Sequence, residues 1–298
     1  MIIGGSKKCV IENIKAAVLD GDLNRKVEEG DAELSPEEEL AVIQKFYDLR
    51  KKPGFSLKRS AMQKMNDVQM KAYDKLISFE GLENLDKLKD TRFGANGASG
   101  ASGAGFIITS NHFNPLDNLC IKKLIKKQYD KLPYIVIQAT NLAAGGVIGE
   151  LFNYLDHIPI CKSASYIRGE FLEHMREVLG SGAPVLIYPE EEMWFNYRKP
   201  RPSKRGAFHF AAELNVPVVP CFVEILDTAR ADNDEFFESE YVVHVLEPLV
   251  PDAAKSVRAN SIEMAARDYG LKKAAYEKAY GKKLDYTFDK SDIANFRW

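Results

Sequence analysis

Paired cysteines are absent from this sequence. Its four cysteines, at positions 9, 120, 161 and 221, are far apart, and no two of them form a C-x-x-C motif. Disulfide frameworks and structural zinc sites both depend on closely spaced cysteines, so the sequence predicts neither. Widely spaced single cysteines are typical of a cytoplasmic protein whose thiols remain reduced.

Long apolar runs and an excess of positive charge are also missing. No apolar run approaches the roughly 18 residues of a membrane-spanning helix. The charged residues Lys7, Lys8 and Glu12 interrupt the first segment, whereas a secretory signal peptide has an uninterrupted apolar stretch. The formal net charge is −2, which argues against a nucleic-acid-binding protein because such proteins are usually basic. Any contact with a membrane is therefore expected to be peripheral.

Residues 1–75 have the pattern of a helical region. A capping box at residues 35–38, with proline in the first turn, predicts a helix that ends before Pro53. A second helix is predicted over residues 56–78, because apolar side chains recur at helical spacing from Leu57 onward.

Residues 51–64, which include the junction of these helices and the start of the second one, are basic. They include five basic residues and no acidic one: Lys51, Lys52, Lys58, Arg59 and Lys64. One interpretation is a solvated face on a helix whose other side covers the core. The other is that the helical pair rests on anionic lipid headgroups, to which basic amphipathic helices bind. At this point both interpretations stay open.

Residues 94–105 consist almost entirely of glycine, alanine and serine. Nucleotide-binding glycine loops follow a strand and open a helix, whereas this segment precedes a predicted strand. It therefore indicates a flexible surface insertion.

From residue 106 onward, apolar runs alternate with amphipathic segments. Strands are predicted at residues 106–110, 134–139, 158–161, 185–188, 216–225 and 241–246, and helices at 165–179, 204–214 and 256–280. This alternation predicts an α/β fold with a mostly parallel central sheet flanked by helices. We expect two parts: an N-terminal helical region over residues 1–75, facing a membrane under the lipid interpretation, and an α/β domain over residues 76–298. The aromatic tail that ends at Trp298 is expected to pack on the body.

A candidate catalytic corner follows the first of these strands. His112 and Asp117 flank Asn114-Pro115, a pair that favours a turn. The corner would lie where a strand ends and a helix begins, the edge at which open α/β sheets build their sites. An imidazole held by a carboxylate can act as a general base, which contributes about 10²–10⁴-fold to rate. A histidine and an aspartate in one loop can equally be structural.

Four blocks along the chain resemble the lysophospholipid acyltransferase family, and in particular its 1-acylglycerol-3-phosphate acyltransferases. The blocks are NH-x4-D at residues 111–117, Ile-Pro-Ile-Cys-Lys at 158–162, Tyr-Pro-Glu at 188–190 and Val-Pro-Val-Val-Pro at 216–220. They occur in the family order, and the resemblance covers roughly residues 77 to 250.

The resemblance implies transfer of an acyl group from a thioester, acyl-CoA or acyl carrier protein, to a lipid hydroxyl. His112 would accept the hydroxyl proton and Asp117 would hold the imidazole, with no metal and no cofactor beyond the thioester. Asn111, Lys162 and Glu190 are expected at the substrate site. The expected partners are a lysolipid, a membrane surface and, for one donor type, acyl carrier protein, but no nucleic acid. The expected location is the cytoplasmic face of a membrane.

Two blocks depart from the family pattern. The second closes with Lys162 where the family has arginine, and in the third Glu191, Glu192 and Met193 replace glycine, threonine and arginine. The family arginine would hold the acceptor's phosphate. Basic residues that follow closely could take over this role or belong to an ordinary solvated loop, and they include Arg198, Lys204 and Arg205.

Other functions are compatible with the same residues. The adjacent carboxylates at 190–192 could suggest a divalent-metal site, but no H-x-x-E or D-x-D pattern accompanies them, so no metal site is predicted. The remaining histidines, at 157, 174, 209 and 244, are expected to be structural. The alternatives to an acyltransferase are a non-catalytic lipid- or acyl-thioester-binding protein and a thioesterase or transacylase on the same scaffold.

Overall fold

The computed structural model describes residues 6–28, 33–89 and 105–298. The glycine-rich segment predicted to be a surface insertion lies outside these residues except for Gly105.

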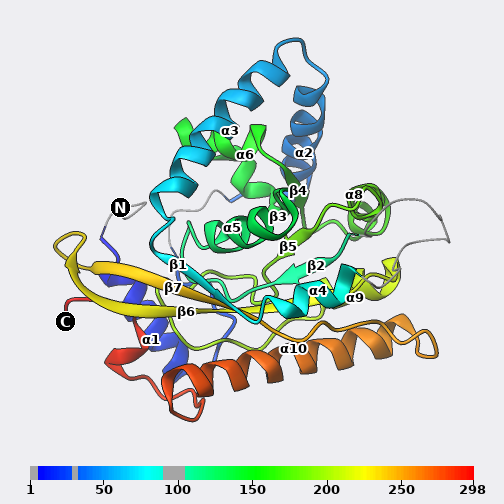
Figure 1. Ribbon diagram of the computed structural model, residues 1–298. Helices are drawn as coiled ribbons and strands as arrows, with labels where there is room; N and C mark the ends of the chain where they lie inside the picture. The colour runs from blue at the N-terminus through cyan, green and yellow to red at the C-terminus, as the bar shows by residue number, and fades with distance from the viewer. Residues whose placement is uncertain (1–5, 29–32, 90–104) are drawn as a thin grey trace.

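A seven-stranded sheet forms the centre of the described chain (Figure 1). Its strands are β1 (Ile77–Glu80), β2 (Ile107–Thr109), β3 (Tyr134–Gln138), β4 (His157–Ile160), β5 (Val185–Ile187), β6 (Val218–Ala231) and β7 (Phe237–Val245). They lie in the order β1-β7-β6-β2-β5-β3-β4. All neighbours pair in parallel except β6 and β7, which are antiparallel. The predicted α/β fold with a mostly parallel sheet is confirmed.

Helices cover both faces of the sheet. They are α1 (Lys8–Leu19), α2 (Pro36–Arg50), α3 (Phe55–Ala72), α4 (Glu83–Lys89), α5 (Asn118–Tyr129), α6 (Gly146–Tyr154), α7 (Ala164–Tyr166), α8 (Leu172–Gly180), α9 (Gly206–Leu214) and α10 (Val257–Tyr280). Short turns of other helix types occur at Ala139–Ala143, Ile167–Phe171 and Lys290–Asp292. α9 and α10 pack together on one face and α5 on the other, with α2 and α3 beyond α5 (Figure 1). β2 and β5 are therefore fully buried, which is why all their residues except Thr109 are apolar.

The capping box that starts α2 is present, because the Ser35 side chain accepts a hydrogen bond from the Glu38 backbone and the Glu38 side chain accepts one in return. The predicted second helix ends earlier than expected, at Ala72 instead of residue 78. Its last residues belong to β1, because Ile77 and Ser78 pair in parallel with Tyr241 and Val242 of β7. That pairing partner is far away in the sequence, so helical spacing could not reveal it.

The buried face of α3 is not the apolar stripe that the sequence suggested. Its buried residues are Asn66 and Met70, whereas Leu57 is 77% exposed and Val68 is 68% exposed. The apolar stripe that predicted the helix therefore lies mostly at the surface and does not cover the core. The basic side chains are solvated, as the first interpretation expected, because Lys51, Lys52, Lys58 and Lys64 are exposed.

The N-terminal helix and the C-terminal tail share a second hydrophobic cluster. Side chains of α1, among them Ile11 and Ile14, pack there with Trp194, Phe195 and Ile293. The expected packing of the aromatic tail on the body is confirmed by a bridge between Phe236 and Phe296.

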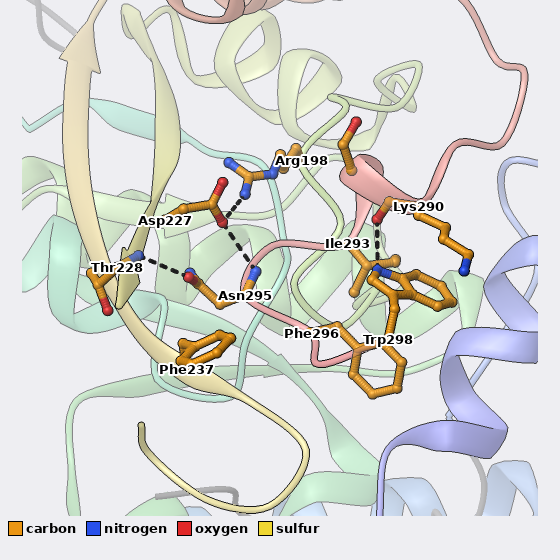
Figure 2. Close-up of a pocket in the computed structure, with 10 residues that line it drawn as sticks. Arg198, Asp227, Thr228, Phe237, Lys290, Ile293, Asn295, Phe296 and Trp298 are labelled. Carbon is orange, nitrogen blue, oxygen red and sulfur yellow. Dashed lines mark hydrogen bonds and ion pairs between the residues drawn. The ribbon is translucent and has the colours of Figure 1, made fainter. Parts of the chain in front are cut away.

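A hollow of about 400 Å³ lies beside this tail (Figure 2). Phe237, Phe296 and Trp298 line it together with Arg198 and Asp227. Neither member of the candidate catalytic corner contributes to its lining.

A buried charged cluster joins α10 to the strand that leads into the corner. Asp268 accepts hydrogen bonds from the Thr109 hydroxyl of β2 and, at 2.6 Å, from the Ser203 hydroxyl. Lys272, one helical turn further, pairs with it at 2.9 Å. Both charged side chains are fully buried. This cluster therefore fixes the last residue of β2 against the helical layer behind it.

Removing the carboxylate of this cluster should destabilise the protein strongly. Asp268→Ala leaves the Lys272 ammonium buried without its counter-charge, a change that typically costs about 3–5 kcal/mol. Urea unfolding at neutral pH measures the loss. The matched control is Asp48→Ala, which breaks the exposed Lys51–Asp48 pair and should cost at most about 1 kcal/mol. Equal losses in the two variants would contradict this role of Asp268.

Candidate active site

The predicted catalytic corner lies at the carboxyl edge of the sheet, between the end of β2 and the start of α5. A turn shapes it, since the Asp117 backbone N–H donates to the Asn114 carbonyl at 3.0 Å and the Leu116 N–H donates to the Asn114 side chain at 3.0 Å. Asparagine favours such turns because its side chain bonds to its own backbone two residues on. The turn expected from Asn114-Pro115 is therefore present, and it brings His112 and Asp117 together.

His112 and Asp117 form a hydrogen-bonded pair. The distance from His112 Nδ1 to Asp117 Oδ2 is 2.8 Å. Asp117 Oδ2 also accepts the backbone N–H groups of Phe113, at 2.9 Å, and Asn114, at 3.3 Å. The Asp117 side chain is 2% exposed and that of His112 is 22% exposed. The carboxylate is thus fixed, and the imidazole keeps one edge toward the surface.

This geometry sets the tautomer of the histidine. Asp117 Oδ2 accepts hydrogen bonds from two backbone N–H groups, those of Phe113 and Asn114, which favour the ionised carboxylate. An ionised carboxylate can only accept, so the third contact requires an N–H on His112 Nδ1. A neutral His112 therefore carries its proton on Nδ1 and presents Nε2 as a lone-pair base. Within the described residues, Nε2 has no hydrogen-bond partner. The corner is therefore arranged to accept a proton from a group that arrives at the exposed edge of the ring.

Tyr188 is a site residue that the sequence did not reveal as one. It follows β5 directly, its hydroxyl donates to Asp117 Oδ1 at 2.6 Å, and its ring stacks on the His112 imidazole with centroids 4.0 Å apart. Burial and the neighbouring Asp117 charge raise the pKa of Tyr188 well above its ordinary value. Its place in the third block was the available signal, but an aromatic residue at a strand end is more often a core residue.

Glu190 anchors the corner from the other side. Its carboxylate accepts the His112 backbone N–H at 3.3 Å and the Arg201 backbone N–H at 3.0 Å. It also pairs with the Arg201 guanidinium at 3.0 Å, and both side chains are buried. Burial lowers the pKa of Arg201, and the Glu190 charge opposes this shift. Glu190 therefore lies next to the corner, and within the described chain its oxygens are engaged by these partners, whereas the sequence predicted a substrate contact.

The loop after Glu190 pairs with the corner through its backbone. Trp194 N–H donates to the His112 carbonyl at 3.1 Å, and Asn196 N–H donates to the Phe113 carbonyl at 2.7 Å. The loop begins with Glu191 at a φ of 62°, the left-handed region that favours glycine. Glycine occupies this position in the family block, so the backbone turn is kept although the side chain differs.

Two other predicted substrate residues, Asn111 and Arg198, are buried and bond to other parts of the protein. Asn111 is buried, and its side-chain amide both donates to and accepts from the Val223 backbone, at 3.0 and 2.8 Å. It thereby ties the end of β2 to β6. Arg198 is buried beside the hollow shown in Figure 2, where its guanidinium bonds to the Ile225 carbonyl and to Asp227.

The remaining predicted residues lie at the surface. Lys204 pairs with Glu191 at 2.5 Å, and its backbone N–H donates to the Pro189 carbonyl at 2.8 Å, next to Glu190. Arg205 follows it and is exposed. Lys162 is exposed at the carboxyl end of β4, with β3 and β5 between it and β2. These three cations therefore face the solvent on the same side of the sheet as the corner.

The other histidines occupy different environments. His157 is buried, and burial lowers its pKa to about 3, so it is neutral. His174 pairs with Glu177 at the surface, and His244 lies between Glu80 and Glu224. Among the described residues no cluster of three histidine, cysteine or acidic side chains is placed to hold a metal ion. In the same part of the chain, no helix has the length and apolarity required to cross a membrane.

Comparisons with known proteins place this geometry in context. The family model described as Acyltransferase matches residues 76–224, half of the chain. Among solved structures, the chain is similar to the 1-acyl-sn-glycerophosphate acyltransferase PlsC from Thermotoga maritima, at 15% sequence identity and a TM-score of 0.46. That match covers 83% of this chain and 98% of the Thermotoga chain. No curated protein matches the sequence.

Neutralising Glu190 should destabilise the corner. Glu190→Gln keeps the size of the side chain but leaves the buried Arg201 guanidinium without its counter-charge, so the free energy of unfolding should fall by about 3–5 kcal/mol. Chemical denaturation measures the change. Glu213→Gln, the same substitution at an exposed position of α9, is the control and should stay within about 0.5 kcal/mol of the parent. A Glu190→Gln protein as stable as this control would refute the anchoring role.

Proposed function

The chain belongs to the acyltransferase family, and we propose that it transfers a fatty acyl group from a thioester to the hydroxyl of a lysophospholipid or a related glycerolipid. The donor would be acyl-CoA or acyl carrier protein. The observation that carries the proposal is the 2.8 Å contact between His112 Nδ1 and Asp117, which leaves Nε2 of the partly exposed imidazole to accept a proton.

The reaction follows from this arrangement. The acceptor hydroxyl oxygen attacks the thioester carbonyl carbon while its proton passes to His112 Nε2. The ionised Asp117 carboxylate stabilises the imidazolium that forms, as in the hydrolase triads, with the substrate hydroxyl in place of a serine. The carbon–sulfur bond then breaks, and the thiolate takes the proton from Nε2. An ester and a free thiol result, and His112 is neutral again.

The acceptor is expected to carry an anionic group that the exposed cations can reach. Lys204 and Arg205 lie beside the Pro189-Glu190 turn, and Lys162 lies at the same sheet edge. Because Glu191 already pairs with Lys204, an anion would compete with a carboxylate for that ammonium. We therefore assign Lys162, Lys204 and Arg205 to acceptor recognition and Asn111, Glu190 and Arg198 to support of the site.

A membrane surface is the proposed location of the reaction. The exposed stripe of α3 includes Leu57, Ala61 and Val68, and exposed lysines, among them Lys58 and Lys64, flank it. An apolar stripe between basic side chains is the pattern of a helix that lies in a lipid interface, and each basic residue near an anionic surface contributes about 1 kcal/mol. We place this surface on the cytoplasmic face of a membrane.

Replacing His112 should abolish acyl transfer without unfolding the protein. The purified protein is incubated with a panel of lysolipids and a radiolabelled acyl donor, either acyl-CoA or acyl carrier protein that bears the labelled acyl thioester. The products are identified by mass. Loss of the base in His112→Ala should lower turnover at least about 10²–10⁴-fold, with unchanged circular dichroism. Undiminished turnover in this variant would refute the proposal. Thiol release to water alone would indicate a thioesterase, and neither product nor thiol would indicate a binding protein.

Charged substitutions on α3 should weaken membrane binding. Leu57→Glu combined with Val68→Glu places two carboxylates on the exposed stripe and should reduce sedimentation with anionic phospholipid vesicles at least tenfold. Binding of the parent should also fall as salt rises, because salt screens surface charges. The control is Ile262→Glu, which changes an exposed apolar residue of α10 on the other side of the molecule from α3 (Figure 1). Equal losses in both variants would contradict a docking role specific to α3.

A further inference from the structure

Tyr188 contacts both members of the catalytic pair. Its hydroxyl reaches Asp117 Oδ1 at 2.6 Å, and its ring lies nearly parallel to the His112 imidazole, at an interplanar angle of 18°. Asp117 Oδ2 already accepts three N–H groups, from His112, Phe113 and Asn114. Within the described residues, the Tyr188 hydroxyl is the hydrogen-bond partner of Oδ1.

The direction of this hydrogen bond is determined by chemistry. Burial and the Asp117 charge raise the pKa of Tyr188 well above its ordinary value, so its hydroxyl stays protonated over the working pH range. An ionised carboxylate can only accept. Tyr188 therefore donates to Asp117 and competes with His112 for the electron density of the same carboxylate.

We propose that Tyr188 is a positioning residue that keeps His112 in its neutral, basic form. A donor on Oδ1 weakens the attraction of the carboxylate for an imidazolium, so the protonated form of His112 is less favoured. The stacked phenol ring holds the imidazole plane so that Nε2 faces outward. This inference rests on the proposed function, because it assigns Tyr188 a part in the same proton transfer.

The other titratable groups near the pair do not supply this effect. The Glu190 carboxylate, which accepts the His112 backbone N–H, is compensated by Arg201 at 3.0 Å. Burial raises the pKa values of Cys120 and Tyr241, so both stay neutral beside the Asp117 charge. Tyr188 is therefore the neighbour whose hydrogen bond acts directly on the carboxylate.

The test removes the hydroxyl and keeps the ring. The imidazole of His112 is titrated by nitrogen-15 NMR in the full chain, and His112→Ala identifies its signal among the five histidines. In Tyr188→Phe, the titration midpoint should rise by about one pH unit, a tenfold change in the protonation equilibrium. The acid limb of the kcat/KM profile should move by the same amount. An unchanged or lowered midpoint would overturn the proposal.

Two further proteins complete the experiment. Tyr129→Phe removes a hydroxyl that bonds to the Leu85 carbonyl at the far end of α5 and should leave the midpoint unchanged. Incorporation of 3-fluorotyrosine at position 188 keeps the hydroxyl but makes it a stronger donor, and it should lower the midpoint. This second substitution keeps the test decisive if the Phe variant does not fold, since a raised or unchanged midpoint would then overturn the proposal.

The readout separates the two levels of inference. The NMR titration needs no substrate, so it reports on Tyr188 whether or not the protein transfers acyl groups. Absence of acyl transfer by the parent protein would contradict the proposed function alone. A parent that is active and a Tyr188→Phe midpoint that does not rise would contradict only the role of Tyr188.

Discussion

The buried ion pair between Glu190 and Arg201 is the interaction on which the candidate active site depends. The Glu190 carboxylate accepts hydrogen bonds from the backbone N–H groups of His112 and Arg201 and also pairs with the Arg201 guanidinium. The guanidinium in turn bonds to the Leu23 carbonyl in the N-terminal segment and faces the Trp194 ring. Segments nearly 180 residues apart in sequence thus meet at one buried charge, and the position of His112 depends on all of them. Because an unpaired buried charge is costly, this assembly leaves the corner little freedom to shift.

The basic run that follows Glu190 illustrates how folding separates charges of one kind. Three of its cations are buried, and each pairs with a carboxylate: Arg198 with Asp227, Lys199 with Asp292, and Arg201 with Glu190. Only the last members of the run, Lys204 and Arg205, remain at the surface. The run therefore mainly holds the loop after Glu190 in place, and its solvent-accessible end is the part that we propose for acceptor recognition.

A physical connection also joins α3, the proposed membrane helix, to α5, the helix that follows the candidate catalytic corner. Lys122, on the helix that begins directly after Asp117, donates to Asn66 of α3 at 2.9 Å inside the protein. Burial lowers the pKa of Lys122 to about 8, so this contact is held in an environment that disfavours charge. The exposed apolar stripe lies on the other side of α3 from this contact. A helix that touches lipid on one side and the catalytic helix on the other would hold the corner near an amphiphilic acceptor.

The sequence by itself determined the features that depend on residues a few positions apart. Apolar periodicity, the capping box of α2 and the Asn114-Pro115 turn act over a few positions, so they predicted the α/β class and the meeting of His112 with Asp117. The tertiary structure alone decided which partners distant groups find. Asn111 bonds to β6, Asp268 reaches back to Thr109, and Tyr188 closes on Asp117, at separations of 71 to 159 residues. The face of α3 that is buried was undecided for the same reason: periodicity marks an apolar stripe, but only the packing of other elements determines whether protein or solvent covers it.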